Sequence, residues 1–216
     1  MSSRNRVTPT GSLIAAPGTR GLLMGNRGIL LSKHYELEQP NVKGKPWITC
    51  VMKDGNNIPI PESPVKYTKL FFLDELTAFA AGHRPCGGCQ RARYKLFLEI
   101  WGRVNGVQNA PIDTSLHVER CGGRDGGIKP VVLRQLSSLP SGTMVALARG
   151  GTPHLLHTGK LFPWSVNGYG HPVTAAMYTE VQVLTPPSIV KVFQAGFPLP
   201  LDIETTVHPS AKAYLG

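Results

Sequence analysis

The sequence predicts an α+β protein in two parts, with short strands and two helices over residues 1–121 and a small β-rich, barrel-like part over residues 128–216. Four apolar side chains recur at the spacing of one helical face, namely Tyr94, Phe97, Leu98 and Trp101. After residue 141, short apolar runs alternate with Gly-Gly, Thr-Gly and Asn-Gly pairs, which is typical of successive hairpins. The glycine-rich loop 122–127 lies between these two patterns and is the predicted domain boundary.

The first strands and the first helix are predicted from β-branched runs and helix end signals. Residues 45–52 (KPWITCVM) and 67–73 (YTKLFFL) are rich in apolar, β-branched and aromatic side chains, so each is expected to form a strand. Asp74 can accept backbone N–H groups as the N-cap of a short helix, and Gly82 can end that helix in a left-handed conformation. Pro85 disfavours helical geometry at the residue before it, so the next helix must begin beyond it.

Later helices are predicted by the same rules. A basic helix begins at Gln90 and carries the apolar stripe, and a short one starts at Asp113 or Thr114. A helical segment is also expected up to Ser138. The last helix, in PPSIVKVFQAG, takes Thr185 as its N-cap, has a proline in its first turn and stops at a glycine.

The charge balance of the chain indicates a polyanionic partner. Lys and Arg number 23 against 13 Asp and Glu, which gives a formal net charge of +10. Such a field attracts nucleic acid, the commonest polyanion in a cytosol. Arginines between glycines, as in GTRG and GNRG, place a guanidinium beside backbone N–H groups and can contact phosphate. We expect DNA rather than RNA, with phosphate contacts from Arg4, Arg6, Arg27, Arg84, Arg91, Arg93 and Lys95.

The sequence favours a cytoplasmic protein with no membrane association. It has no run of about eighteen apolar residues, which excludes a membrane-spanning helix. Its N-terminus carries arginines but lacks the continuous apolar stretch of a secretory signal. In the reducing cytoplasm the four cysteines favour metal binding or chemistry over disulfides.

The pair Cys86-Gly-Gly-Cys89 has three interpretations. A redox pair would stand between a strand and a helix of a thioredoxin-like fold, but no βαβ succession surrounds it. A metal knuckle would need two further ligands, because structural Zn²⁺ takes four, and the two glycines suit a turn whose amides face the sulfurs. The third interpretation is a turn that happens to contain two thiols. The spacing favours the metal knuckle.

The segment LFFLDELTAFAAGHRPCGGCQR resembles the zinc-binding domain of the Ada-type DNA alkylation-repair proteins. The matching residues are Phe71, Phe72, Ala78, Ala80, Ala81, Gly82, Arg84, Pro85, Cys86 and Cys89. Upstream, WITC resembles the strand that ends in the first zinc cysteine of the family, which maps to Cys50. The resemblance covers residues 47–93 and implies an Ada-like zinc-binding domain, with a basic N-terminal arm, for the N-terminal part.

The resemblance implies zinc bound by Cys50, Cys86 and Cys89 and leaves the fourth ligand open. The second cysteine of the family lies a few residues after the first, and here that place holds Asp54. His117 is the preferred candidate, because LHVER is expected to form a helix that packs over the knuckle. The alternatives are Cys121, His34 and Asp54.

The expected function is a zinc-binding, nucleic-acid-binding protein without catalytic activity. In the Ada-type family a zinc-bound thiolate accepts a methyl group from a DNA phosphotriester, and by position that nucleophile maps to Cys50. Because one family cysteine is missing, the remaining sulfurs would be less nucleophilic, which weighs against this alkyl transfer. A third alternative is a zinc-stabilised module whose partner is a protein.

Overall fold

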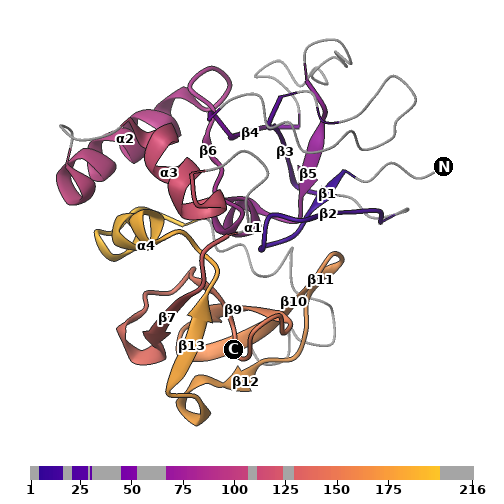
Figure 1. Cartoon of the computed structure of the whole chain (residues 1–216), viewed down its shortest axis with the longest axis vertical. Coiled ribbons are helices and arrows are strands. Elements are labelled where there is room, and N and C mark those ends of the chain that lie inside the picture. The colour runs from indigo at the N-terminus through magenta and orange to yellow at the C-terminus, as the bar shows by residue number, and fades with distance from the viewer. Residues whose placement is uncertain are drawn as a thin grey trace.

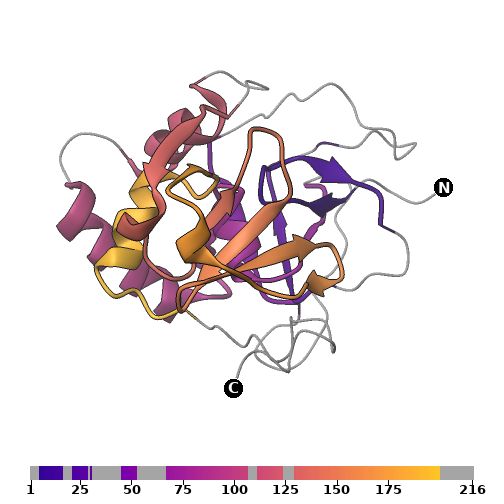
Figure 2. The ribbon, with the colours of Figure 1, turned by 90° about the horizontal axis from the view of Figure 1, so that it is seen from below.

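The computed structural model describes residues 5–16, 21–28, 30, 45–52, 67–106, 111–123 and 129–199. Over these residues the chain is α+β, as predicted, with four α-helices and two β-sheets. Figure 1 shows the N-terminal strands at the upper right, helices α2 (Arg91–Asn105) and α3 (Ile112–Cys121) at the upper left, and the C-terminal strands below. Seen from below, the helices again lie on one side and the N-terminal strands on the other (Figure 2).

The N-terminal sheet has the strand order β2-β1-β5-β3-β4-β6. Its strands are β1 (Arg6–Val7), β2 (Leu13–Ile14), β3 (Leu23–Asn26), β4 (Ile48–Cys50), β5 (Leu70–Phe72) and β6 (Arg84–Pro85). Strands β4 and β5 lie within the two strands predicted from sequence. Strand β4 runs antiparallel to β3 and parallel to β6, with Ile48 opposite Arg84 and Thr49 opposite Pro85. This short parallel pair positions the cysteines.

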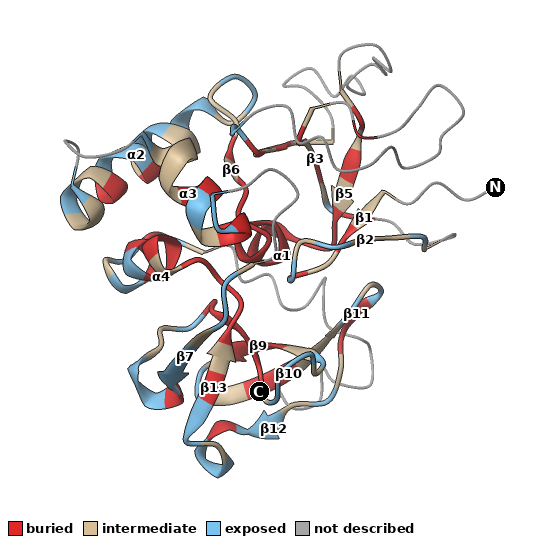
Figure 3. Cartoon of the chain, in the orientation of Figure 1, coloured by how far each residue is buried: buried red, intermediate tan, exposed pale blue. Residues whose placement is uncertain are grey.

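Helix α1 (Glu75–Ala80) is buried along its whole length and lies at the centre of the molecule (Figure 3). Asp74 is its N-cap, as predicted, because its side chain accepts the backbone N–H of Thr77 at 2.7 Å. Gly82 follows the helix with a φ of 81°, a left-handed conformation that disfavours any side chain. A Cβ at this position would also collide with Arg120, 2.9 Å away.

Helix α2 buries a slightly different face from the one predicted. Phe97 and Trp101 are buried as expected, but Leu98 is 38% exposed and Ile100 takes the buried position instead. The difference is a small rotation of the helix about its axis, since residues 97, 100 and 101 still share one face. Helix α3 begins at Ile112, one residue before the earlier of its two predicted starts, Asp113 and Thr114.

The C-terminal sheet is built from antiparallel neighbours. Its strands are β7 (Val132–Gln135), β8 (Met144–Ala146), β9 (Pro153–His157), β10 (Lys160–Ser165), β11 (Gly168–Tyr169), β12 (Val173–Thr174) and β13 (Glu180–Val183). Strands β8 to β11 form the expected succession of hairpins. The path runs β11-β10-β9-β8-β13-β7, with β12 beside β10, and its two ends do not pair within the described residues, so the sheet is open rather than barrel-like.

Two local predictions for this half were wrong. The helix expected up to Ser138 is instead strand β7 followed by a single 3-10 turn, Leu136–Ser138, because β7 pairs with β13. Helix α4 (Pro187–Gln194) forms where predicted, but Thr185 does not cap it. The hydroxyl of Thr185 accepts the backbone N–H of Met144 at 2.9 Å, which ties the start of the helix to β8.

One hydrophobic core joins the helices of the N-terminal half to the C-terminal sheet and α4 across the predicted boundary at 122–127. Helices α1 and α2 supply side chains from one half, and β8 to β11 and α4 supply them from the other. This shared core includes Phe79, Phe97, Trp101, Met144, Phe162, Tyr169, Ile189 and Phe193. The division of the chain into domains at residues 1–121 and 128–216 stays a prediction. Of the helices described, none has both the length and the apolar character needed to cross a bilayer.

Candidate metal centre

Three cysteines from two distant segments meet at one point. Cys50 ends β4, Cys86 follows β6, and Cys89 lies in the turn before α2. Their sulfur atoms all lie within 4.8 Å of one another. Neighbouring sulfurs of a tetrahedral metal–thiolate site are about 3.8 Å apart. The three side chains can therefore coordinate one metal ion.

Backbone pairing of β4 with β6 brings these sulfurs together. The N–H of Arg84 donates to the carbonyl of Trp47 at 3.0 Å, and that of Cys86 donates to the carbonyl of Thr49 at 2.9 Å. The N–H of Gly88 points at the sulfur of Cys86, with a nitrogen–sulfur distance of 3.4 Å. This last contact is the turn geometry that the two glycines predict, and it stabilises negative charge on the sulfur.

The electrostatics of the three thiols favour a bound cation. Burial, and then the neighbouring sulfurs of Cys86 and Cys89, raise the pKa of the Cys50 thiol. Burial also raises the pKa of Cys89. At Cys86 burial acts in the same direction, but backbone N–H groups of Cys89 and Gly88 outweigh it, so that the pKa of Cys86 is lowered. A divalent cation offsets the repulsion among thiolates and releases their protons.

The structure does not bring the preferred fourth ligand, His117, to the cysteines. Within the described residues the cluster contains Cys50, Cys86 and Cys89 without a fourth His, Cys, Asp or Glu. The imidazole of His117 is buried beside Cys121 of the next helical turn, with Nδ1 3.3 Å from its sulfur. Both side chains therefore face each other along α3. The other two candidates, His34 and Asp54, lie outside the described residues.

The burial of Cys50 bears on its expected alternative role as a nucleophile. Its side chain is only 8% exposed, whereas Cys89 is the exposed member of the three. A sulfur that attacks a DNA phosphotriester must be reached by the DNA backbone. The position of Cys50 therefore favours a structural role for its sulfur.

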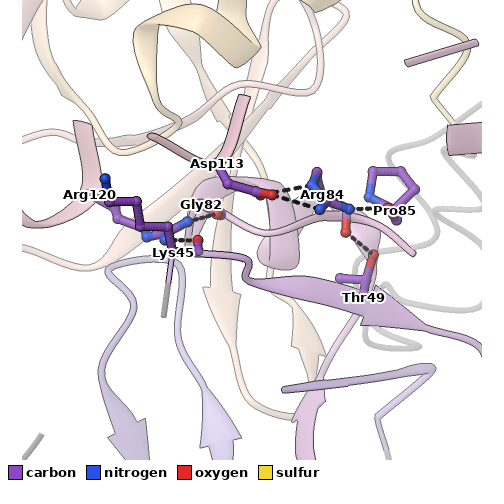
Figure 4. Close-up of polar contacts among 7 residues, drawn as sticks. All are labelled: Lys45, Thr49, Gly82, Arg84, Pro85, Asp113 and Arg120. Atoms are coloured by element: carbon purple, nitrogen blue, oxygen red, sulfur yellow. Dashed lines mark hydrogen bonds and ion pairs between the residues drawn. The ribbon is translucent and has the colours of Figure 1, made fainter. Parts of the chain in front are cut away.

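Two of the predicted phosphate-binding arginines are committed to ion pairs inside the protein. Arg84 donates through Nε and Nη2 to the two carboxylate oxygens of Asp113, at 2.8 and 2.7 Å (Figure 4). Arg93 donates through Nε and Nη2 to Glu75, at 2.6 and 2.5 Å, and also bonds the carbonyl of Pro198. Bidentate pairs of this kind occupy the donors that a phosphate would need.

The other predicted contacts differ in their exposure. Arg91 and Lys95 are exposed on α2. Arg6 is half-buried, with its guanidinium 5.2 Å from the ring centroid of Phe71. Arg27 is buried. Arg4 lies outside the described residues. Of the described members of the predicted set, Arg91 and Lys95 are therefore the two that lie exposed on the surface, where they can meet a phosphate.

A second polar cluster, which the sequence did not predict, lies at the other end of the β4–β6 pair. Trp47 and His83 each stand three residues before a cysteine of the metal site, and their rings are 5.1 Å apart. His83 is fully buried. Those equal offsets from Cys50 and Cys86 are the sequence signal for this proximity.

Comparison with protein-family models, curated proteins and solved structures finds no match to this chain.

Proposed function

We propose that this protein binds zinc through Cys50, Cys86 and Cys89 and contacts nucleic-acid phosphates through the exposed basic surface of α2. The observation that carries the proposal is the meeting of three sulfurs, from two distant segments, within 4.8 Å of one another. Zinc would fix the β4–β6 pair relative to the start of α2, because its ligands end β4, follow β6 and lie in the turn before α2.

The donor set favours zinc among the common metals. Three thiolates are soft ligands, which suit Zn²⁺ and disfavour Mg²⁺ or Ca²⁺. A structural zinc site takes a fourth ligand, and Asp54 or His34 remain candidates for it. Structural zinc contributes about 10 kcal/mol or more to folding in zinc-finger peptides, so the metal can stabilise a sheet of very short strands. The resemblance to Ada-type zinc domains supports the same assignment.

Nucleic acid is the partner that the charge supports. The chain carries 23 Lys and Arg against 13 Asp and Glu, and Arg91 and Lys95 project from α2 where they can meet phosphates. Contacts of this kind position a protein on a duplex without reading its sequence. The buried sulfur of Cys50 makes binding the better proposal than alkyl transfer.

Metal analysis tests the zinc proposal. We expect one zinc per wild-type chain by elemental analysis, and a Co²⁺-substituted protein with the thiolate charge-transfer absorption of a tetrahedral site. Cys86→Ser should lose the metal, whereas Cys121→Ser, a buried cysteine outside the cluster, should keep it. Of Asp54→Asn and His34→Gln, the variant that weakens cobalt binding identifies the fourth ligand, and His117→Gln, a change away from the cluster, should bind cobalt like wild type. A wild-type protein without zinc or cobalt affinity contradicts the proposal.

Salt dependence tests the nucleic-acid proposal. Fluorescence anisotropy with a labelled DNA duplex should give an affinity that falls steeply as salt is raised, because each phosphate contact releases counterions. An RNA duplex of the same sequence tests the preference for DNA. Absence of binding at low salt, or binding that is insensitive to salt, contradicts a phosphate-contacting role.

A further inference from the structure

Five residues from separate segments form a buried cationic cluster, here called the Trp47 cluster: Arg27, Trp47, His83, Arg120 and Lys129. The guanidinium carbons of Arg27 and Arg120 each lie 3.9 Å from the centroid of the Trp47 ring. Two guanidinium groups cannot occupy the same face at that distance, so the indole is stacked between them. Arg27 also donates through Nε to Nε2 of His83, at 3.2 Å.

Within the described part of the chain, three buried nitrogen atoms of Arg27, Trp47 and His83 have no hydrogen-bond partner. They are Nη2 of Arg27, Nε1 of Trp47 and Nδ1 of His83. Since Nε2 of His83 accepts a hydrogen bond, its proton is assigned to Nδ1, and all three atoms are donors. The three residues are 6%, 6% and 0% exposed. Each buried donor left unpaired costs about 1–3 kcal/mol, so an acceptor would stabilise the cluster, chiefly at Arg27 and Trp47, because the backbone of Ala78 and Ala81 already interacts with the His83 ring.

The charge of the cluster points to a negative acceptor. Arg27 bonds the carbonyl of Gly11, and Lys129 bonds the carbonyl of Ala80, so neither cation forms an ion pair within the described residues. Glu119 is the acid whose charge reaches Lys129, but its carboxylate accepts hydrogen bonds from Ser188. Within the described residues, Arg27 and Lys129 are therefore balanced by carbonyl dipoles and, at Lys129, by the charge of Glu119 without a direct ion pair, and a bound anion would supply further negative charge.

Access to the cluster is limited to a small group. Arg27, Trp47, His83 and Arg120 are all buried, and Lys129 is the member with intermediate exposure, so an anion would enter beside it. Arg120 is held in place by bonds to the carbonyls of Gly82 and Lys45 (Figure 4). Donors as buried as these suit a small anion better than an internal phosphate of a duplex, which carries a sugar on both sides.

We propose that the Trp47 cluster binds a small phosphate-type oxyanion, with Arg27, Trp47 and His83 as hydrogen-bond donors and Lys129 at the entrance. The phosphate is either the free inorganic ion or the terminal phosphate of a small molecule, since both present the same oxygens. The proposal goes beyond the function proposed above, and it requires neither zinc nor nucleic acid at the surface of α2.

The indole N–H of Trp47 provides a direct test in the wild-type protein. With ¹⁵N-labelled tryptophan, and with Trp47 assigned from a Trp47→Phe sample, inorganic phosphate at constant ionic strength should shift this resonance to saturation. The N–H of Trp164 is the internal control, because it already donates to the hydroxyl of Thr77 at 3.0 Å. If chloride shifts the Trp47 resonance as much as phosphate does, or if phosphate causes no saturable shift, the proposal is wrong.

Charge-removing variants provide the second test. Arg27→Gln should weaken phosphate binding by about tenfold or more, which corresponds to about 1.4 kcal/mol. The control, Arg6→Gln, removes another arginine that stacks on an aromatic ring and should leave phosphate binding unchanged. If Arg27→Gln does not fold, Lys129→Met takes its place. Wild-type affinity in both Arg27→Gln and Lys129→Met contradicts the proposal.

A competition experiment identifies the source of the phosphate. A nucleoside 5′-monophosphate that displaces inorganic phosphate and shifts the Trp47 resonance supports a site for terminal phosphates. If inorganic phosphate binds saturably and the monophosphate does not compete with it, the site is one for the free ion. Chelation of the metal should leave the Trp47 response present in any protein that remains folded, which separates this site from the zinc proposal.

Discussion

The hydroxyl of Tyr169 donates a 2.7 Å hydrogen bond to Oδ2 of Asp74. The other oxygen of the same carboxylate accepts the N–H of Thr77, so one side chain begins helix α1 and also holds strand β11. Trp164, on the neighbouring strand β10, bonds the hydroxyl of Thr77. The start of α1 is therefore a point at which the two halves of the chain are joined by buried polar contacts.

Removal of the Tyr169 hydroxyl tests this junction. Tyr169→Phe should lower the free energy of unfolding by about 1–3 kcal/mol, because it leaves a buried carboxylate oxygen without its donor. Urea denaturation followed by circular dichroism measures the change. Tyr178→Phe, in which the ring packs on a different apolar cluster, should stay within about 0.5 kcal/mol of wild type. Equal stability of Tyr169→Phe and wild type would show that the bond adds no net stability.

Separate roles for neighbouring basic residues of α2 give a second prediction. Arg91→Ala/Lys95→Ala should reduce the slope of log affinity against log salt by about 2, at nearly unchanged stability. Arg93→Ala should lower stability by about 3 kcal/mol, because it leaves the buried carboxylate of Glu75 without its ion-pair partner. Anisotropy with duplex DNA and urea denaturation measure the two effects. A double variant that binds DNA like wild type would remove α2 from the proposed interface.

Local signals predicted the elements better than they predicted the contacts between them. The cap at Asp74 and the glycine after α1 are each decided within a few residues, and both are confirmed. The helix expected up to Ser138 failed because β13, far away in the sequence, pairs with that segment. Thr185 has the residue type of an N-cap, yet its hydroxyl bonds β8 instead. In both cases a tertiary partner overrides a local preference.

The candidate site divides in the same way. The meeting of Cys50 with Cys86 and Cys89 was predicted from the resemblance of residues 47–93 to Ada-type zinc domains. That resemblance includes both the strand that ends in Cys50 and the turn that holds the other two cysteines. The roles of the arginines could not be predicted from the sequence. An arginine that binds phosphate and an arginine that pairs with a carboxylate of the same protein have the same sequence pattern. Arg84 reaches Asp113 on another helix, a contact that only the packing of α3 creates. The buried donors around Trp47 likewise depend on three-dimensional neighbours.

Metal removal should loosen the β4–β6 pair before it affects the rest of the fold. The pair is held by few backbone bonds, among them those donated by Arg84 and Cys86. Chelation should therefore speed the hydrogen exchange of these two amides by about tenfold or more, equivalent to about 1.4 kcal/mol of opening free energy. The amide of Leu156, bonded to Thr143 in the C-terminal sheet, is the control. Unchanged exchange at Arg84 after verified metal loss would contradict a structural role for the metal.

The last prediction concerns the pH dependence of stability that Lys129 creates. Burial, and then the charge of Arg27, lower the pKa of Lys129 from 10.5 to about 7 in the folded protein, while Glu119 opposes this shift and Arg120 adds to it. Between these two values the unfolded chain holds a proton that the folded chain has released, so stability should rise with pH across that window. The pKa of Arg27 is itself lowered to about 9, so the comparison is made between about pH 7 and about pH 8.5, in a buffer without phosphate. Urea denaturation should show a rise in the wild type that Lys129→Met lacks. Lys191→Met, at an exposed position of α4, is the control and should keep the rise in stability. If the rise is also seen in Lys129→Met, the titrating group is not Lys129.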